Sequence, residues 1–156
     1  MAKTLIRRAT AADFPVLLDI DKDSFPPGVA YDSLELSYFM SRRGAQTLVL
    51  EEDGTIAAFL LMEVHRNTNT ATIVTLDVRE AFRRRGFASR LIEQSEEILA
   101  EHSIEVYDLQ VDVENAVAIA FYTKHGFEPA RVLRNYYSNG NDAYLMVKKL
   151  RPSGRR

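Results

Sequence analysis

Three arginines and a glycine stand together at residues 83–88, which read R-R-R-G-F-A, a composition suited to holding an anion. A β-branched apolar run ends at Val78 just before this stretch, and a segment with helical spacing of apolar residues follows it. The first N–H groups of a helix have no partner inside the helix, so they collect at its N-terminus and bind phosphate groups. We therefore predict a phosphate-binding turn at residues 83–88.

Two commoner phosphate loops are missing from the sequence, which contains neither G-x-x-x-x-G-K-[ST] nor G-x-G-x-x-G. The pattern present is [RQ]-x-x-G-x-[GA], with Arg83, Gly86 and Ala88 at its fixed positions. Taken alone, this hexapeptide fits an ordinary solvated turn before a helix equally well. The choice between the two interpretations depends on the rest of the chain.

A second candidate group is the pair Asn115 and Tyr122, which are seven residues apart in a helical pattern. Residues at this spacing share one face of a helix two turns apart, and the small Ala118 between them leaves room beside the backbone. A ligand could lie along that face. Taken alone, Asn115 is more simply explained as a helix N-cap, and Tyr122 as an aromatic residue at the edge of the core.

The elements that must position these residues follow from the spacing of apolar residues and from turn signals such as Asp53-Gly54. A helix separates the strand ending at Val78 from the next strand, so the right-handed crossover rule makes those two strands parallel neighbours. The expected strands are 5–9, 47–51, 56–65, 71–78, 105–113, 131–137 and 142–149, and the expected helices are 11–24, 33–43, 88–100 and 116–125.

The composition fits one globular domain, with 156 residues, 46% hydrophobic and 27% charged. We expect this domain to span residues 1–150 and residues 151–156 to form a frayed basic tail. Lys and Arg number 20 against 22 Asp and Glu, so the net charge of -2 gives no electrostatic case for nucleic acid as a partner.

Cysteine is absent, which excludes a thiolate metal site and a cysteine nucleophile carrying a covalent acyl intermediate. His65, His102 and His125 show no metal-ligand spacing, so no metal is expected. The start of the chain lacks a continuous apolar signal segment, and no stretch approaches the ~18 apolar residues that a membrane span needs. We expect a cytoplasmic protein without membrane contact.

The order of strand, R-x-x-G-x-A turn, helix, strand and N-x-x-A-x-x-x-Y-x-x-x-G-F helix resembles the GNAT superfamily of acetyl-CoA-dependent N-acetyltransferases. The second motif stands at Asn115, Ala118, Tyr122, Gly126 and Phe127. The resemblance covers residues 5–150 in element order. It implies an α/β (α+β) GNAT fold, with a mixed, mostly antiparallel sheet of about seven strands, a splayed parallel pair in its middle and about four helices.

The resemblance also implies acetyl-CoA as cofactor and CoA as product. The backbone amides of residues 84–89 would hold the pyrophosphate, the main chain of Val78 would orient the acetyl group, and Asn115 would contact the pantetheine side. Tyr122 would be the general acid that protonates the departing thiolate, whose pKa of ~8.5 makes it a poor leaving group unaided. The expected cofactor-binding residues are Leu76, Val78, Arg83, Arg84, Arg85, Gly86, Phe87, Ala88, Ser89, Asn115, Ala118 and Tyr122.

Within the superfamily, three stretches resemble protein N-terminal acetyltransferases, including the bacterial ribosomal-protein-alanine type. They are the loop at 25–31, the segment R-N-Y-Y at 134–137 and the strand D-A-Y-L-M at 142–146. The implied substrate is a protein or peptide N-terminus, a ribosomal protein being one candidate, and the chain would be a monomer or weak dimer. The expected substrate-binding residues are Phe25, Pro26, Tyr31, Tyr136 and Tyr137.

Gln110 departs from this subgroup, which often has a Glu or His base at that position. Gln cannot accept the proton of the amine, although it can position a water. At pH ~7.5 an α-amine of pKa ~7.7–8.0 is roughly a quarter to two-fifths neutral, whereas a lysine is only about 0.1% neutral. An α-amino acceptor therefore tolerates a missing base far better than a lysine does.

Other carboxylates are candidate bases, of which Asp112 shares a strand face with Gln110 and Asp77 stands beside Val78. Glu35 and Glu63 are weaker candidates, and a solvated charge or an ion pair is the commoner role for each of these residues. Two other functions also fit the resemblance. One is a GNAT enzyme that acetylates a small-molecule amine, and the other is a non-catalytic sensor that binds acyl-CoA.

Overall fold

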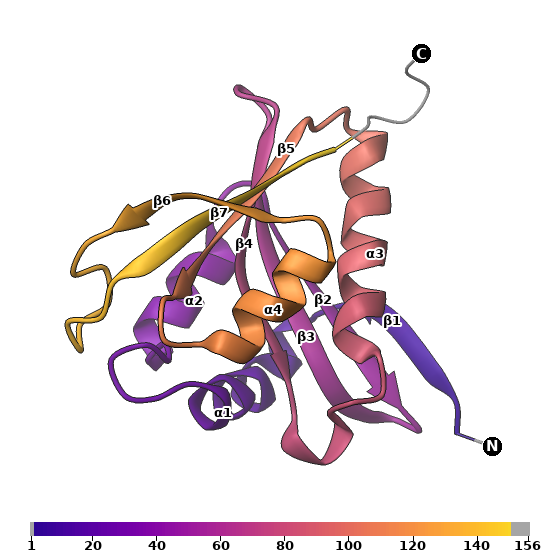
Figure 1. Cartoon of the computed structure of the whole chain (residues 1–156). Helices are drawn as coiled ribbons and strands as arrows, with labels where there is room; N and C mark the ends of the chain where they lie inside the picture. The colour runs from indigo at the N-terminus through magenta and orange to yellow at the C-terminus, as the bar shows by residue number, and fades with distance from the viewer. Residues whose placement is uncertain (1, 151–156) are drawn as a thin grey trace.

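The computed structural model describes residues 2–150, which form one seven-stranded mixed sheet with helices on both faces (Figure 1). The strand order is β1-β2-β3-β4-β5-β7-β6, and every neighbouring pair is antiparallel except β4 and β5. The predicted mixed sheet with one parallel pair is therefore confirmed. The strands are β1 (Thr4–Arg8), β2 (Ala45–Glu52), β3 (Thr55–His65), β4 (Thr70–Val78), β5 (Val106–Asp112), β6 (Glu128–Leu133) and β7 (Ala143–Lys149).

Four α-helices cover the sheet, with α3 and α4 on one face and α1 and α2 on the other (Figure 1). Each face has its own apolar core, and β3 is buried on both sides because it lies between them. The predicted tail at residues 151–156 lies outside the described residues. The helices are α1 (Phe14–Ser24), α2 (Ser33–Ser41), α3 (Phe87–Glu101) and α4 (Ala116–Lys124), with short 3-10 turns at Ala11–Asp13 and Glu80–Phe82.

Side chains cap the starts of α2 and α4. The Asp32 side chain accepts a hydrogen bond from the backbone N–H of Glu35, and the Asn115 side chain accepts one from Ala118. The first helix differs from the prediction, because residues 11–13 form a 3-10 turn and the α-helix begins only at Phe14. Pro15 lies in the first turn of α1, where its missing N–H costs no hydrogen bond.

The predicted strand over residues 131–137 is confirmed for residues 131–133, which pair with β7, and was wrong for residues 134–137. The strand β6 runs over Glu128–Leu133, and the chain turns at Asn135, whose φ of 52° is left-handed. Aromatic and β-branched residues favour strands, but an αL residue interrupts the extended backbone whatever its neighbours prefer. Tyr136 and Tyr137 consequently lie in the connection between β6 and β7, outside the sheet.

The parallel strands β4 and β5 pair only along part of their length. Residues Thr70 to Ile73 pair with Val106 to Leu109, and beyond this point no ladder joins the two strands. They diverge toward their carboxyl ends (Figure 1). This separation leaves room for a ligand in the middle of the sheet.

A β-bulge in β4 lies at the same place. Leu61 of β3 pairs with Thr75 and Met62 pairs with Ile73, so Val74 is the extra residue. Val74 packs in the core beneath α1 and α2, and Thr75 also turns toward α1, where its hydroxyl bonds Asp21. A bulge re-aims the side chains that follow it.

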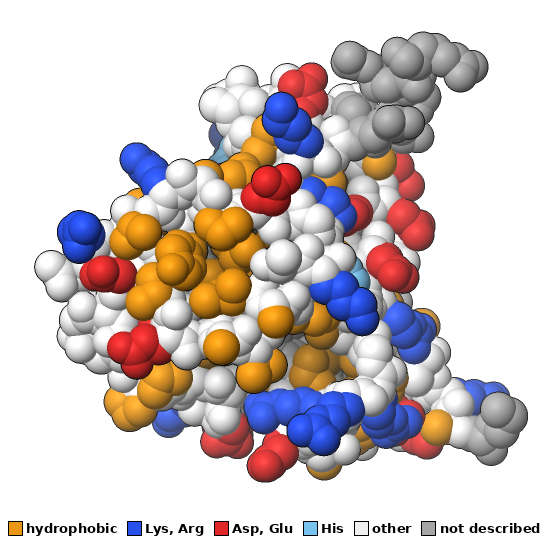
Figure 2. All heavy atoms as spheres, viewed as in Figure 1, with side chains coloured by type: hydrophobic (Ala, Val, Ile, Leu, Met, Phe, Trp, Pro, Cys, Tyr) orange, Lys and Arg blue, Asp and Glu red, His pale blue; other side chains and the backbone are white. Residues whose placement is uncertain are grey.

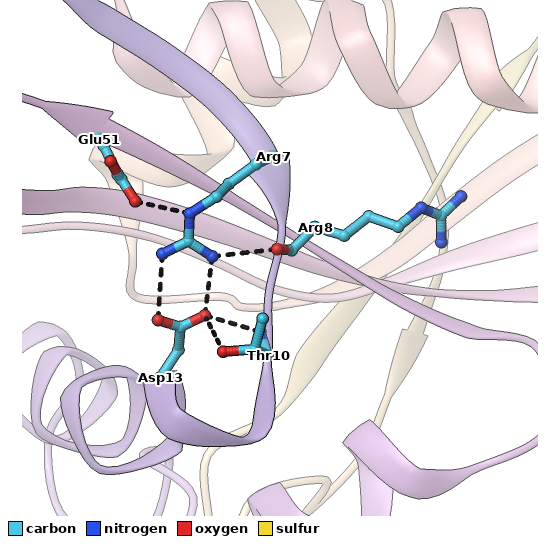
Figure 3. A network of polar contacts seen from close by, with 5 residues as sticks. All are labelled: Arg7, Arg8, Thr10, Asp13 and Glu51. Atoms are coloured by element: carbon cyan, nitrogen blue, oxygen red, sulfur yellow. Dashed lines mark hydrogen bonds and ion pairs between the residues drawn. The ribbon is translucent and has the colours of Figure 1, made fainter. Parts of the chain in front are cut away.

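A network of polar contacts joins β1 to the start of α1 (Figure 3). The Arg7 guanidinium donates to Glu51 at 2.5 Å and to both carboxylate oxygens of Asp13 at 2.9 and 3.1 Å. Asp13 also accepts from the backbone N–H of Thr10 at 2.7 Å. These bonds, that from Arg7 foremost, lower the pKa of Asp13 to about 2.

We expect Asp13→Asn to lower the free energy of unfolding by about 1 kcal/mol at neutral pH, after allowance for solvent screening. Because the folded pKa lies below the ordinary value of 3.8, this contribution is complete above about pH 4 and is lost as the pH falls toward 2. Urea unfolding of both proteins at about pH 7 and about pH 2.5 measures it. An equal difference at the two pH values would contradict the assignment.

Candidate active site

A cavity of about 1020 Å³ opens where β4 and β5 separate, and residues from both faces of the sheet line it. It brings together residues as far apart in the sequence as Asp21 and Asn141. Of the predicted site residues, the lining includes Phe25, Pro26, Tyr31, Leu76, Val78, Arg83, Arg84, Gly86, Phe87, Ala88, Ser89, Gln110, Asp112, Asn115, Ala118, Tyr122, Tyr136 and Tyr137.

The basic turn has a backbone suited to anions. Gly86 is the N-cap of α3 with φ 80°, and Arg84 also has a left-handed φ of 64°. The αL conformation costs a non-glycine residue about 1–2 kcal/mol, so its presence at Arg84 is a local strain that the surrounding turn maintains. Left-handed residues within such a turn direct successive N–H groups toward one point and create an anion-binding concavity. The conformation of Arg84 was not foreseen from the sequence.

The three arginine side chains of the turn have different environments. Arg83 donates from Nε to the carbonyl oxygen of Val78 at 3.0 Å, at the end of β4. Arg85 forms an ion pair with Glu52 and lies over the ring of Phe87, 5.0 Å from its centroid. Arg85 does not line the cavity, whereas Arg83 and Arg84 do. Figure 2 shows Lys and Arg side chains gathered over this part of the surface.

Tyr122 is held in place by the aromatic residues around it. Its ring packs edge-on against Phe121 and Phe127, with centroids 5.3 and 5.6 Å away, and only 9% of the residue is exposed. Burial raises the pKa of Tyr122, with smaller contributions from Asp77 and Tyr137. The phenol consequently keeps its proton throughout the neutral pH range.

Gln110 and Asp112 both line the cavity, and the side-chain oxygens of both residues accept hydrogen bonds. The Tyr136 hydroxyl donates to Gln110 Oε1 at 3.3 Å. The two carboxylate oxygens of Asp112 accept from the backbone N–H of Glu114 and from the Asn141 side chain, each at 2.9 Å. Asp112 thus supports the turn before α4 and the loop before β7.

The structure reveals a buried polar group in which Asp77, a candidate base from the sequence, is joined by Thr75 and Asp21, which the sequence did not indicate. The Thr75 hydroxyl lies 2.5 Å from a carboxylate oxygen of Asp77 and 3.1 Å from one of Asp21, and all three residues line the cavity. The backbone N–H of Tyr31 donates to the second oxygen of Asp21 at 2.8 Å. Thr75 and Asp77 share a strand face by their spacing, but no sequence signal brings Asp21 of α1 to them.

The weaker candidates from the sequence lie elsewhere. Glu35 belongs to the capping box of α2, and Glu63 forms an ion pair with Arg42 at 2.9 Å. Neither lines the cavity. Within residues 2–150 there is no group of three or more His, Cys, Asp or Glu residues arranged to hold a metal ion. In the same part of the chain, no helix has the length and apolarity that crossing a membrane requires.

The sheet splays at its one parallel pair, and a basic turn with two left-handed residues follows the first of these strands. Comparison with known proteins identifies the family: a sequence model of the acetyltransferase (GNAT) family matches residues 14–127. The chain belongs to this family and is an N-acetyltransferase.

Individual relatives agree with this assignment. An N-alpha-acetyltransferase of Sulfurisphaera tokodaii is 30% identical, over 93% of this chain and 92% of that protein. The crystal structure of the ribosomal-protein-S18-alanine N-acetyltransferase from Escherichia coli is similar with a TM-score of 0.84 and 25% identity, covering 99% of this chain and 98% of that one. Ard1 from Thermoplasma volcanium gives a TM-score of 0.85 and 26% identity, covering 95% and 98%.

Proposed function

We propose that the protein transfers the acetyl group of acetyl-CoA to the α-amino group of a protein or peptide N-terminus. The observation that carries this proposal is the continuity of the cavity through the gap between β4 and β5. It is lined by Ala118 and Tyr122 on the α4 side and by Tyr31 on the side of α1 and α2. A donor and an acceptor can therefore approach the same point from opposite faces of the sheet.

The basic turn fits the pyrophosphate of acetyl-CoA. Its two left-handed residues, Arg84 and Gly86, and the free N–H groups at the start of α3 supply donors, and nothing lies within 4 Å of the position of a Cβ on Gly86. The open space at Gly86 lets a phosphate approach the backbone closely. When bound, acetyl-CoA supplies a thioester carbonyl that an amine can attack.

Direct attack by the amine in a ternary complex accounts for the residues present. The chain contains no cysteine to carry the acetyl group, so a covalent acyl-cysteine is excluded. The Tyr122 phenol, like any phenol with a pKa of ~10 or above, is protonated at neutral pH, and it can give that proton to the departing thiolate. We assign Tyr122 as the general acid.

A peptide acceptor is supported by the aromatic residues at the other end of the cavity. The rings of Tyr136 and Tyr137 meet edge to face with centroids 4.9 Å apart, and Tyr136 is 47% exposed. Hydrophobic side chains gather on the surface over β6 and β7 (Figure 2). Tyrosines offer a peptide backbone contact area and hydroxyl groups without requiring one particular side chain. The relatives named as N-alpha-acetyltransferases support the same acceptor.

The acceptor class can be tested by measuring thiol release from acetyl-CoA with a panel of amines. Peptides with free N-termini and varied first residues should give kcat/KM at least about 100-fold above free polyamines and amino acids. Matched peptides that are blocked at the N-terminus but keep a lysine should be inactive, because lysine is almost entirely protonated.

The other outcomes identify the alternatives. Turnover of a small amine together with indifference to every peptide would make the protein a small-molecule acetyltransferase. Binding of acetyl-CoA without thiol release for any amine would indicate a sensor and contradict the proposal.

A further inference from the structure

Asp77 occupies an unusual place for a carboxyl group. It stands on β4 next to Val78, lines the cavity, and is only 1% exposed. Its Oδ1 is bonded to the Thr75 hydroxyl, whereas its Oδ2 is buried with no hydrogen-bond partner among residues 2–150. A buried polar atom without a partner is costly, so its retention beside an active-site cavity suggests a function.

The carboxylate oxygens of Asp77 and Asp21 outnumber the hydrogen-bond donors that face them. Thr75 has one hydroxyl proton, yet its oxygen lies within hydrogen-bond distance of both Asp77 and Asp21. Asp21 also receives the backbone N–H of Tyr31. A further proton on Asp77 would satisfy the group, because a neutral carboxyl can donate one hydrogen bond. The arrangement therefore has a place for one more proton than its own donors provide.

Asp77 also contrasts with Asp112, another acid that lines the cavity. Each oxygen of Asp112 accepts a hydrogen bond, one from the turn before α4 and the other from the loop before β7, so neither oxygen is unpartnered. Gln110 cannot accept a proton at all. Among the cavity residues in 2–150, Asp77 therefore combines a buried oxygen that has no hydrogen-bond partner with a second oxygen that is bonded to a hydroxyl group.

We propose that Asp77 receives the proton of the acceptor amine through the Thr75 hydroxyl, with Asp21 as a positioning residue that orients Thr75. The inference rests on the proposed function only in requiring that the acceptor is an amine. Asp77 would then be the base of the reaction, a role that the amide of Gln110 cannot fill.

The proposed reaction begins with proton transfer from the acceptor ammonium. An ammonium N–H proton passes to Thr75 Oγ1 while the Thr75 proton passes to the Asp77 carboxylate, which leaves a neutral amine and a neutral carboxyl. The amine nitrogen bonds to the thioester carbon, the C–S bond breaks, and the thiolate takes the Tyr122 proton. The second proton of the nitrogen restores the Tyr122 phenol. Asp77 then loses its proton to solvent, so that one ammonium and one acetyl-CoA give one amide, one CoA thiol and one proton.

The surroundings of Asp77 favour this task. Burial raises the pKa of Asp77 well above its usual range, and the neighbouring Asp21 raises it further, while the hydrogen bond from Thr75 and the charge of Arg83 oppose them. A base whose pKa lies nearer the working pH transfers protons more efficiently. The groups that face Asp77 are Asp21 on α1, Tyr31 between α1 and α2, Arg83 in the basic turn, Tyr122 on α4 and the apolar Phe59 opposite it on β3.

The test is the pH profile of kcat/KM for Asp77→Asn, using the amine that the acceptor panel identifies. We expect a loss of about 100-fold roughly 1.5 pH units below the pKa of that amine, which is pH ~6.5 for an α-amine. The loss should shrink to about 10-fold or less about one unit above that pKa, where the amine is supplied neutral. The Kd of acetyl-CoA should not change. A loss that is equal at every pH, or no loss, would overturn the proposal.

A matched pair elsewhere in the sheet provides the control. Thr72 donates to Asp108 at 2.6 Å, burial raises the pKa of Asp108 as it does that of Asp77, and neither residue lines the cavity. Asp108→Asn should leave the profile unchanged. If it reproduces the pH-dependent loss, the effect belongs to buried Thr–Asp pairs in general and the assignment of Asp77 fails.

Thr75 gives a second route that does not depend on the folding of the Asp77 variant. Thr75→Val removes the hydroxyl and should reproduce the pH-dependent loss, whereas Thr75→Ser keeps it and should retain most activity. Equal activity of these two variants would remove Thr75 as the relay. Because each result is read on whichever amine is turned over, failure of the peptide assignment and failure of the Asp77 assignment are distinguishable.

Discussion

Tyr122→Phe is expected to lower kcat by about 100- to 1000-fold while the Kd of acetyl-CoA stays within about twofold. The variant removes only the hydroxyl, and the ring contacts with Phe121 and Phe127 remain. The expelled thiolate then has to take its proton from water. Single-turnover measurement of acetyl transfer, combined with calorimetric titration of acetyl-CoA, separates the chemical step from binding.

A second buried tyrosine supplies the control for this result. Tyr107 lies in the core, where its hydroxyl donates to Ser95 at 2.8 Å, and burial raises its pKa as it does that of Tyr122. It does not line the cavity. Tyr107→Phe should therefore lose some stability but keep its turnover. If Tyr122→Phe turns over within about threefold of the original protein, Tyr122 is not the acid.

Gly86→Val is expected to weaken acetyl-CoA binding by roughly 10- to 100-fold, equivalent to losing one or two charge-assisted hydrogen bonds. At a φ of 80° a β-branched side chain strains the turn, and it fills the open space through which a phosphate would approach the backbone amides. The change should appear mainly in the KM and Kd of acetyl-CoA, with much less effect on the KM of the acceptor.

Gly54→Val separates this effect from backbone strain. Gly54 has a φ of 85° and, like Gly86, nothing within 4 Å of a Cβ position, but it stands in the hairpin between β2 and β3 and outside the cavity lining. Both variants should lose about 1–2 kcal/mol of stability, since both place a side chain on a left-handed residue. Similar acetyl-CoA affinity in the two variants would show that the turn at Gly86 does not hold the cofactor.

Much of this fold was predictable because its signals are local. The Asp53-Gly54 turn, the cap at Asp32 and the helical spacing before Gly126 each act over a few residues, and the structure has the elements they indicate. The error at residues 131–137 has the same origin. Strand propensity was read correctly, but a single left-handed residue at Asn135 ends the strand, and propensity does not report backbone dihedrals.

The arginines of the basic turn illustrate a limit of sequence reasoning about a site. The motif marks all three alike, and only the packed structure distinguishes Arg85, which pairs with Glu52, from Arg83, which bonds the end of β4. The partners belong to other strands, and their proximity is a property of the sheet.

The sequence by itself determined the order of elements, the parallel neighbours around the crossover helix, and the two motifs at residues 83–88 and 115–127. These depend on residue spacing along one segment or on a chirality rule that every chain obeys. Only the tertiary structure decided that Asp77 has an unpartnered oxygen whereas Asp112 does not. A bulge in β4 and the docking of α1 bring Thr75 and Asp21 to Asp77, and such contacts between distant segments arise only when the elements pack together.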